Sequence, residues 1–402
     1  MNARRSAATL AAATMLCMAA APVATADTAP PANLPSGLYG KTDPKYDGVF
    51  RQSYALLAQD TVGVKPAAKA VDWLTGQACD NGSYAAFRED PSKACDAKTV
   101  VDSNSTASAI QALAALGGHD AEVKKSVEWL RSVQNEDGGW GYNPGLPSDA
   151  NSTSLVVGAL KAAGQNPAEV KSQKDKAPAD ALVALSMDCA EGKGAFGLAD
   201  MKTGKLAPNA DATAAGVLGG LEQGLVVKAA AKSEPVKCAK AADAKAAAQI
   251  GAAYLADTLA KDGYLTSSMP GAEDQPDYGN TADSVVALSA AGLTDQAKKP
   301  LEYLEKNGAA WAEQSGSPAA YSQLIFAAHA AGADPKDFGG TDLVTALNAM
   351  GPAPEKAESA AAKDEKKDED SSSMNVWWII GVFFVASVGV GFLISGRKKN
   401  SL

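Results

Sequence analysis

The chain has 402 residues, of which 46% are apolar, 21% charged and only 6% aromatic, and its formal net charge is −9. This length allows a sizeable buried core, and the many alanines with few aromatic residues favour closely packed helices over a β-sandwich. The 46 acidic residues outnumber the 37 lysines and arginines, so the surface repels phosphate backbones and nucleic acid is excluded as a partner.

Residues 1–26 have the features of a secretory signal peptide. Arg4 and Arg5 precede an apolar, alanine-rich run, and Ala24-Thr25-Ala26 supplies the small residues that a signal peptidase requires. We therefore expect cleavage after Ala26, followed by an N-terminal extension over residues 27–44. An uncleaved anchor helix is the alternative, and the short apolar run disfavours it.

Residues 45–350 contain an internal repeat in which a short polar motif opens an apolar helix. Four clear copies lead into ASAIQALAALG, SLVVGALKAAG, AAGVLGGLEQG and DSVVALSAAG, and a degenerate fifth copy precedes AAYSQLIFAAHAAG. The motifs carry side chains suited to capping a helix N-terminus: Asp102, Asn104, Asp149, Asn151, Asp211 and Asn280. The helices are expected to end at glycines in the left-handed conformation: Gly117, Gly164, Gly224, Gly292 and Gly332.

Each of these helices is followed by a second helix that carries more charge. Val123, Val127 and Leu130 share one face of the first such helix. This pattern predicts an inner layer of helices rich in small residues and an outer layer of amphipathic helices. With further helices over residues 50–60 and 341–350, the sequence predicts about twelve helices, or about six hairpins.

One segment, Trp129-Leu130-Arg-Ser-Val-Gln134-Asn-Glu-Asp-Gly138-Gly139-Trp140, resembles the Gln-Trp repeat of squalene cyclases and protein prenyltransferases. Fragments of further copies are Trp73-Leu74-Thr-Gly-Gln77 and Lys261-Asp262-Gly263-Tyr264. The resemblance implies an all-α fold, an α/α toroid of inner and outer helices over residues 45–350, which transcobalamin-type binding proteins share. In this family the Gln and Trp of the repeat pack one hairpin on the next, so Gln134, Gly138 and Trp140 are expected to have structural roles.

The resemblance also places the loops that enter the inner helices at one mouth of the toroid. Most of the aromatic residues lie in these segments, and free N–H groups at helix N-termini point the same way. Such a mouth suits a flat or amphipathic ligand, although helix capping is the alternative role of the polar residues. The expected ligand-binding set is Tyr84, Phe87, Asp102, Asn104, Trp140, Tyr142, Asp149, Asn151, Phe196, Asp211, Tyr264, Tyr278, Asn280 and Trp311.

The sequence lacks the catalytic motifs of the related enzymes. No Asp-x-Asp-Asp tetrad is present, and neither of the two histidines, His119 and His329, has a cysteine at metal-ligand spacing. We expect His119 to cap a helix and His329 to lie in the core, with no catalytic residue, metal or cofactor. The weak candidate for an acid deep in the barrel is Asp283, one turn into an inner helix.

Four cysteines remain in the mature chain, Cys79, Cys95, Cys189 and Cys238. An even number in an exported protein suggests two disulfides, and Cys79–Cys95 is the most plausible pair because it closes one loop. Cys189 and Cys238 would pair by elimination, but the toroid places them near opposite ends of the barrel. Either the insertion at 225–237 returns along the barrel, or both thiols stay free.

The C-terminal residues predict a stalk and a membrane anchor. Residues 351–375 are rich in Pro, Ala, Lys, Glu and Asp without an apolar face, as in a disordered spacer. Residues 376–395 begin with nineteen uncharged residues, enough for a helix of ~29 Å across a bilayer core of ~30 Å. Arg397-Lys398-Lys399 lies in the tail, 396–402, and predicts a cytoplasmic C-terminus.

These features support two hypotheses. The first is a non-catalytic binding or scaffold protein on the outer face of the cell membrane, which captures a small amphipathic or corrinoid-like ligand for a membrane protein partner. The second is a terpene cyclase- or prenyltransferase-like enzyme that acts on isoprenoid substrates.

Overall fold

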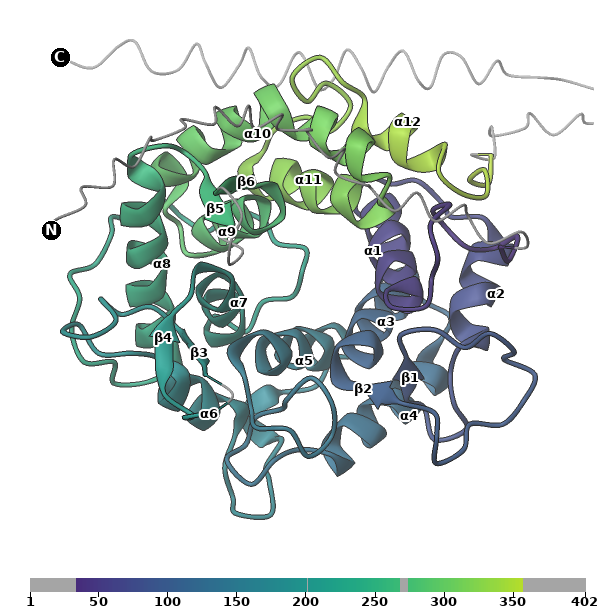
Figure 1. Cartoon of the computed structure of the whole chain (residues 1–402), viewed down its shortest axis with the longest axis horizontal. Helices are drawn as coiled ribbons and strands as arrows, with labels where there is room; N and C mark the ends of the chain where they lie inside the picture. Colours follow the sequence, from purple (N-terminus) through teal and green to yellow (C-terminus); the bar gives the residue numbers. More distant parts are fainter. Residues whose placement is uncertain (1–33, 201, 268–273, 357–402) are drawn as a thin grey trace, which may run out of the picture. The chain divides into compact units, whose positions relative to one another are not determined.

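The computed structural model describes residues 34–200, 202–267 and 274–356, which form a ring of helices (Figure 1). These residues contain twelve α-helices and three small two-stranded sheets, so the predicted helix-rich fold is confirmed. No helix in the described ranges is long and apolar enough to cross a membrane. The predicted signal peptide, transmembrane helix and basic tail, and most of the stalk, lie outside the described residues.

Six helices form the inner wall of the ring, each packed on the next, with the last closing on the first. They are α1 (Gly48–Thr61), α3 (Ser103–Leu116), α5 (Ala150–Ala162), α7 (Ala210–Gly220), α9 (Tyr278–Ala290) and α11 (Pro318–Ala331). Small residues allow their close approach, because a Cβ at Gly219 of α7 would lie 2.3 Å from Ser154 Oγ of α5. The small residues of the inner layer therefore have a packing role.

Six outer helices surround this wall. They are α2 (Ala68–Gly76), α4 (Asp120–Ser132), α6 (Pro178–Leu185), α8 (Ala244–Ala260), α10 (Thr294–Ser315) and α12 (Leu343–Asn348). Each packs on the inner helix of its own hairpin: α2 on α1, α4 on α3, and so on around the ring. In α4, Val123, Val127 and Leu130 are buried while Lys124 and Glu128 are exposed, which is the amphipathic pattern expected of the outer layer.

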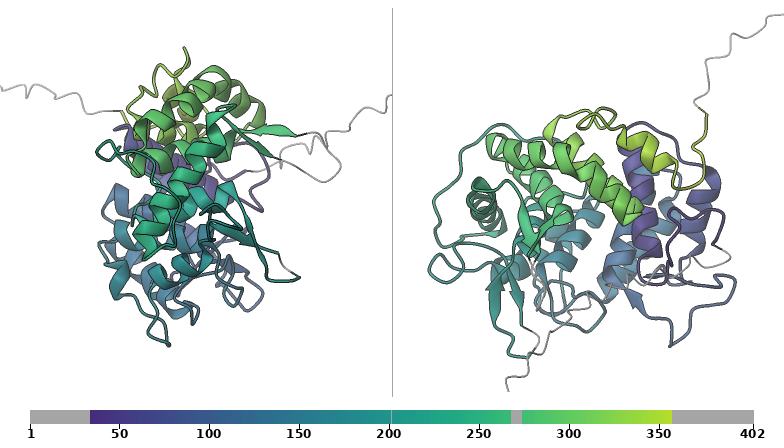
Figure 2. Two further views of the ribbon diagram at one scale, coloured as in Figure 1. Left: turned by 90° about the vertical axis from the view of Figure 1, so that its left-hand side faces the viewer. Right: turned by 45° about the horizontal axis from the view of Figure 1, so that its top comes forward.

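Short antiparallel hairpins lead into three of the inner helices. They pair β1 (Tyr84–Ala85) with β2 (Val101–Asp102), β3 (Gly197–Ala199) with β4 (Leu206–Pro208), and β5 (Leu265–Ser267) with β6 (Gln275–Asp277). The β3–β4 and β5–β6 hairpins project from the same face of the ring (Figure 2, left). Because inner and outer helices alternate along the chain, this face also gathers the N-termini of the inner helices.

Four inner helices carry a threonine that holds the segment preceding the helix. Its Oγ1 accepts a hydrogen bond from a buried backbone N–H, at 3.0 Å in each copy: Tyr84 to Thr106, Trp140 to Thr153, Phe196 to Thr213 and Leu265 to Thr281. A glycine with positive φ stands two residues before each donor: Gly82, Gly138, Gly194 and Gly263. We call this arrangement the threonine joint: a glycine with positive φ, a buried N–H donor two residues later and a threonine acceptor in the inner helix. The Gln-Trp motif contains one of its four copies, and Tyr, Phe or Leu replaces Trp as the donor in the others.

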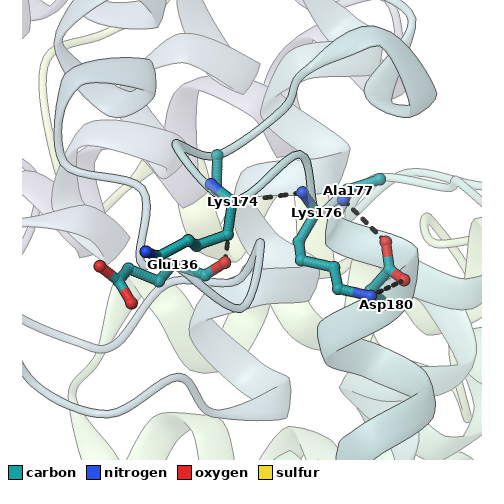
Figure 3. A network of polar contacts seen from close by, with 6 residues as sticks. Glu136, Lys174, Lys176, Ala177 and Asp180 are labelled. Carbon is teal, nitrogen blue, oxygen red and sulfur yellow. Dashed lines mark hydrogen bonds and ion pairs between the residues drawn. The ribbon is translucent and has the colours of Figure 1, made fainter.

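The turn that carries Gly138 packs against the loop before α6. A Cβ at Gly138 would lie 2.3 Å from the carbonyl oxygen of Ala177, so this position requires glycine for space as well as for its φ of 92°. The loop is itself held in place, because Asp180 accepts from the Ala177 N–H at 2.8 Å and from Lys176 Nζ at 3.2 Å. Figure 3 shows these two bonds together with Glu136, which lies two residues before Gly138 in the facing turn.

The N-caps of the inner helices differ partly from the expected positions. Asp102 and Asp149 cap α3 and α5, each accepting a hydrogen bond from the backbone N–H three residues later. The caps of α7 and α9 are Asn209 and Asp277, which precede the predicted positions by two and three residues. The second polar residue of each motif, namely Asn104, Asn151, Asp211 or Asn280, lies within the helix. It is therefore not needed as the N-cap and is available for another role.

Two further expectations about helix ends are wrong. Gly224 does not end α7 in a left-handed conformation; Glu222 has the positive φ there, at 53°. Gly224 is instead needed for space, because a Cβ would lie 2.6 Å from Gln111 Oε1. His119 occupies the N-cap position of α4, but its side chain makes no capping hydrogen bond.

Both predicted disulfides are present. Cys79–Cys95 and Cys189–Cys238 have Cα–Cα distances of 5.5 and 5.8 Å. The long segment between α7 and α8 first pairs with the end of α9, through Ala230 N–H to the Ser289 carbonyl oxygen. It then returns to the Cys189 loop, so the alternative of free thiols is wrong and the insertion does travel back along the ring.

Candidate functional site

The inner wall of the ring encloses a cavity of about 170 Å³, lined by residues from all six inner helices. The loop after α7, at 223–225, closes part of it. The polar side chains that line the cavity are Asn104, Gln111, Asn151, Ser154, Asp211, Gln223, Asp283 and Gln323, and the aromatic ones are Phe50, Tyr54 and Phe326. Three of the predicted ligand residues, Asn104, Asn151 and Asp211, are therefore brought together here.

The repeat explains why these three side chains meet. Each is the second residue of its helix, two positions after the N-cap, in α3, α5 and α7. Neighbouring repeats present this position to the axis of the ring. Asn151 Nδ2 donates to Asp211 Oδ2 at 2.5 Å, which links α5 to α7 across the cavity wall.

Asp283 of α9 is the second carboxyl group of the cavity. Gln323 of α11 donates to its Oδ2 at 3.0 Å. Burial, with the nearby charge of Asp211, raises the pKa of Asp283 to about 7, although the Gln323 hydrogen bond opposes the shift. Burial also raises the pKa of Asp211, against the effect of the Asn151 hydrogen bond. The two carboxyls thus share a poorly solvated space in which both are not readily ionised at once.

Three aromatic rings lie on the same cavity. The Tyr54 ring centroid is 4.1 Å from that of Phe50 and 5.6 Å from that of Phe326. Burial, together with the charges of Asp283 and Asp211, raises the pKa of Tyr54 well above its ordinary value. The rings of α1 and α11 and the carboxyls of α7 and α9 therefore face a common volume.

Two polar atoms of residues in the cavity wall have no hydrogen-bond partner in the part of the chain that the structure describes. They are Ser154 Oγ and Asn104 Oδ1, and the Ser154 residue is only 4% exposed. Buried polar atoms without partners are rare in folded proteins. Both atoms belong to residues that line the cavity.

Other predicted ligand residues lie elsewhere. Tyr84, Trp140 and Phe196 are 0%, 1% and 0% exposed, so they are not at the mouth as expected. They belong to the threonine joint, which turns their side chains into the space between the inner and outer helices. Trp140 Nε1 also donates to the Leu130 carbonyl oxygen at 2.8 Å, and this bond ties the joint to α4.

Phe87, Asp102 and Tyr142 line a separate open groove of about 620 Å³ beside the disulfide loop. Burial raises the pKa of Asp102 to about 6, although the hydrogen bond from the Ser105 backbone N–H opposes the shift. This groove lies outside the inner wall. The remaining polar predictions act within their own motifs, since Asp149 is the α5 cap and Asn280 Nδ2 donates to Asp277 Oδ2 at 2.7 Å.

Tyr264, Tyr278 and Trp311 come together in a stack of rings that also includes Tyr303 of α10. Neighbouring centroids are 4.5, 5.8 and 5.5 Å apart in the order Tyr264, Tyr303, Tyr278, Trp311. The stack buries ring faces against each other, so it joins the β5–β6 hairpin, α9 and α10. It does not line the axial cavity.

The sequence reasoning missed several residues of the cavity, namely Phe50, Tyr54, Ser154, Gln323 and Phe326. A helical spacing does connect some of them, since Phe50 and Tyr54 are four residues apart and Ser154 follows Asn151 by three. That spacing alone does not say which helical face points to the axis. Among the described residues, no group of three or more His, Cys, Asp or Glu side chains is arranged to hold a metal ion.

Alternating inner and outer helices closed into a ring, with a cavity on the axis, are consistent with an α/α toroid. Residues 99–169 match the sequence model of the family described as squalene-hopene cyclase C-terminal domain. This segment contains α3, α4, α5 and the Trp140 joint, and the match confirms the predicted resemblance to the prenyltransferase and squalene cyclase repeat proteins. No curated protein matches the chain.

Proposed function

We propose that this protein binds a small organic ligand in the cavity at the axis of its helical ring. The observation that carries the proposal is the convergence of all six inner helices on one cavity that combines aromatic rings, two carboxyl groups and several amide side chains. An apolar wall with a few placed polar groups is the usual form of a small-molecule site. A cavity of about 170 Å³ suits a small ligand or one end of a longer one.

We place this binding function outside the cell, on a protein held at the membrane by residues 376–395 and spaced from it by a stalk. Support comes from the uncharged run, the basic tail that follows it and the signal-like N-terminus. The two disulfides also suit an oxidising compartment. A membrane protein that receives the ligand is the partner expected for such an arrangement.

Native mass spectrometry of the full chain, before and after incubation with an extract of its own cells, tests the binding function. We expect a discrete added mass on the wild-type protein. Ala215 lines the cavity, so Ala215→Leu fills part of the space and is expected to abolish the adduct. Ala121 is exposed on α4, and Ala121→Leu is the matched control that retains it. The same added mass on Ala215→Leu would place the ligand elsewhere and contradict the proposal.

A second candidate is acid-catalysed rearrangement of an isoprenoid. The observation that favours it is Asp283, whose pKa of about 7 keeps a proton available near neutral pH beside three aromatic rings. Aromatic faces also stabilise positive charge. Incubation of the protein with linear isoprenoids and chromatography of the extract would then yield a new product, and Asp283→Asn would remove it. Recovery of unchanged isoprenoid from the wild-type protein would exclude this reaction for the substrates tried.

A further inference from the structure

We infer that the ligand is an organic ammonium compound, with its positive nitrogen at Asp211 and Asp283 and its apolar part against the rings of Phe50, Tyr54 and Phe326. This inference rests on the proposed binding function and names the chemical class of the ligand. It follows from the charge, the free acceptors and the rings of the axial cavity.

The charged side chains that line the cavity are all acidic. Its lining includes two carboxyl groups, Asp211 and Asp283, and among the described residues no lysine, arginine or histidine lines it. The charge of Asp211 makes ionisation of Asp283 less favourable. A cation placed between them reverses this effect, because opposite charges at short range favour the ionised form. An anionic ligand would instead add a third negative charge to a poorly solvated site.

The two carboxyl groups of the cavity also keep free acceptor atoms. One oxygen of each carboxyl already accepts an amide N–H, from Asn151 for Asp211 and from Gln323 for Asp283. Within the described residues, the second oxygen of each carboxyl has no donor. The Ser154 hydroxyl, in a residue that is only 4% exposed, also has no partner among these residues, and it can accept or donate a hydrogen bond. An alkylammonium group has only donors, so it can bind the free oxygen of each carboxyl group.

The aromatic rings favour an organic cation over a metal ion. Tyr54 lies between Phe50 and Phe326, with centroid distances of 4.1 and 5.6 Å. Ring faces attract ammonium groups within about 6 Å of the centroid and accommodate the carbon atoms attached to the nitrogen. No cluster of three or more metal-binding side chains occurs in the part of the chain that the structure describes. The combination is therefore typical of a site for an amine with an apolar substituent.

Benzylammonium and benzyl alcohol are suitable probes, because they share an apolar ring and differ in charge. We expect calorimetric titration of the full chain at pH 8 to show benzylammonium binding at least about tenfold more tightly than benzyl alcohol. Asp211→Asn should weaken benzylammonium binding by about tenfold and leave benzyl alcohol binding unchanged. Asp262 is exposed and does not line the cavity, so Asp262→Asn is the charge-matched control and should change neither.

Equal affinity for the two probes, or benzylammonium binding that Asp211→Asn leaves intact, would overturn the ammonium assignment. The proposed function would survive that result if Ala215→Leu still abolishes the adduct from the cell extract. If neither probe binds, the ammonium assignment also fails, while the extract measurement decides the binding function independently. Asp283→Asn provides a second charge-removing variant should Asp211→Asn fail to fold.

Discussion

Replacing Asp283 by asparagine is expected to stabilise the protein at pH 8, although the residue lies in the wall of the axial cavity. Burial and the charge of Asp211 raise the pKa of Asp283 from 3.8 to about 7. One pKa unit corresponds to about 1.4 kcal/mol, so ionising Asp283 lowers the free energy of unfolding by up to about 4 kcal/mol. Asparagine avoids this cost, and its side-chain oxygen still accepts the hydrogen bond from Gln323.

The sign of the pH dependence follows from the direction of the shift. Between pH 3.8 and about 7 the native protein holds the Asp283 proton more firmly than the unfolded chain does. The stabilising contribution is therefore complete below pH 3.8 and is lost as the pH rises through about 7. The variant lacks this contribution, so its advantage over the wild type should grow from pH 4 to pH 7 and stay constant above.

Urea unfolding at pH 5, 6, 7 and 8, followed by tryptophan fluorescence, measures this difference. Asp262→Asn removes a carboxylate whose side chain is 52% exposed and should shift the free energy of unfolding by less than about 0.5 kcal/mol at every pH. If Asp283→Asn is no more stable than the wild type at pH 8, Asp283 ionises without a desolvation cost, which would refute the reasoning. A difference of the same size at pH 5 and pH 8 would refute it equally.

Two further predictions concern the repeated joint. Thr153→Val leaves the buried N–H of Trp140 without an acceptor and should lower the free energy of unfolding by about 1–3 kcal/mol. Thr258→Val, at an exposed position of α8, is the control, and equal losses in urea unfolding would contradict a role for the joint. Gly138→Ala should cost at least about 2 kcal/mol from left-handed strain plus a clash. Gly145→Ala has a similar positive φ but open space around the added Cβ, so calorimetric melting of both variants isolates the clash, which is absent if they melt alike.

The sequence alone identified the helical layers and their number. The distribution of small, apolar and charged residues is local, and it follows directly from which faces of a helix are buried. The structural role expected of Gln134 was local as well, since its side chain donates to the Gly138 carbonyl oxygen at 2.7 Å within the same motif. The Cys79–Cys95 pair was also predicted from the sequence. The pairing of Cys189 with Cys238 was left open there, because the sequence does not give the path of the segment that brings Cys238 back to Cys189.

The direction of individual side chains was not readable in the same way. Tyr84, Trp140 and Phe196 precede inner helices, as a mouth-lining residue would, yet all three are buried. Each donates its backbone N–H to a threonine of the inner helix, and this bond turns the ring toward the outer layer. A residue before a helix has no periodicity from which that rotation can be inferred.

The composition of the axial cavity was decided by the closure of the ring. Asp211 and Asp283 stand on different helices, each surrounded by its own neighbours, and no local pattern relates them. Closure brings these carboxyls to the same cavity as Tyr54, where burial raises the pKa of each acid and the charge of Asp211 raises the pKa of Asp283 further. The sequence by itself thus determined a ring built from helical hairpins, because burial patterns are local. Only the tertiary structure decided which side chains meet at its axis, because desolvation and charge coupling depend on groups that are distant along the chain.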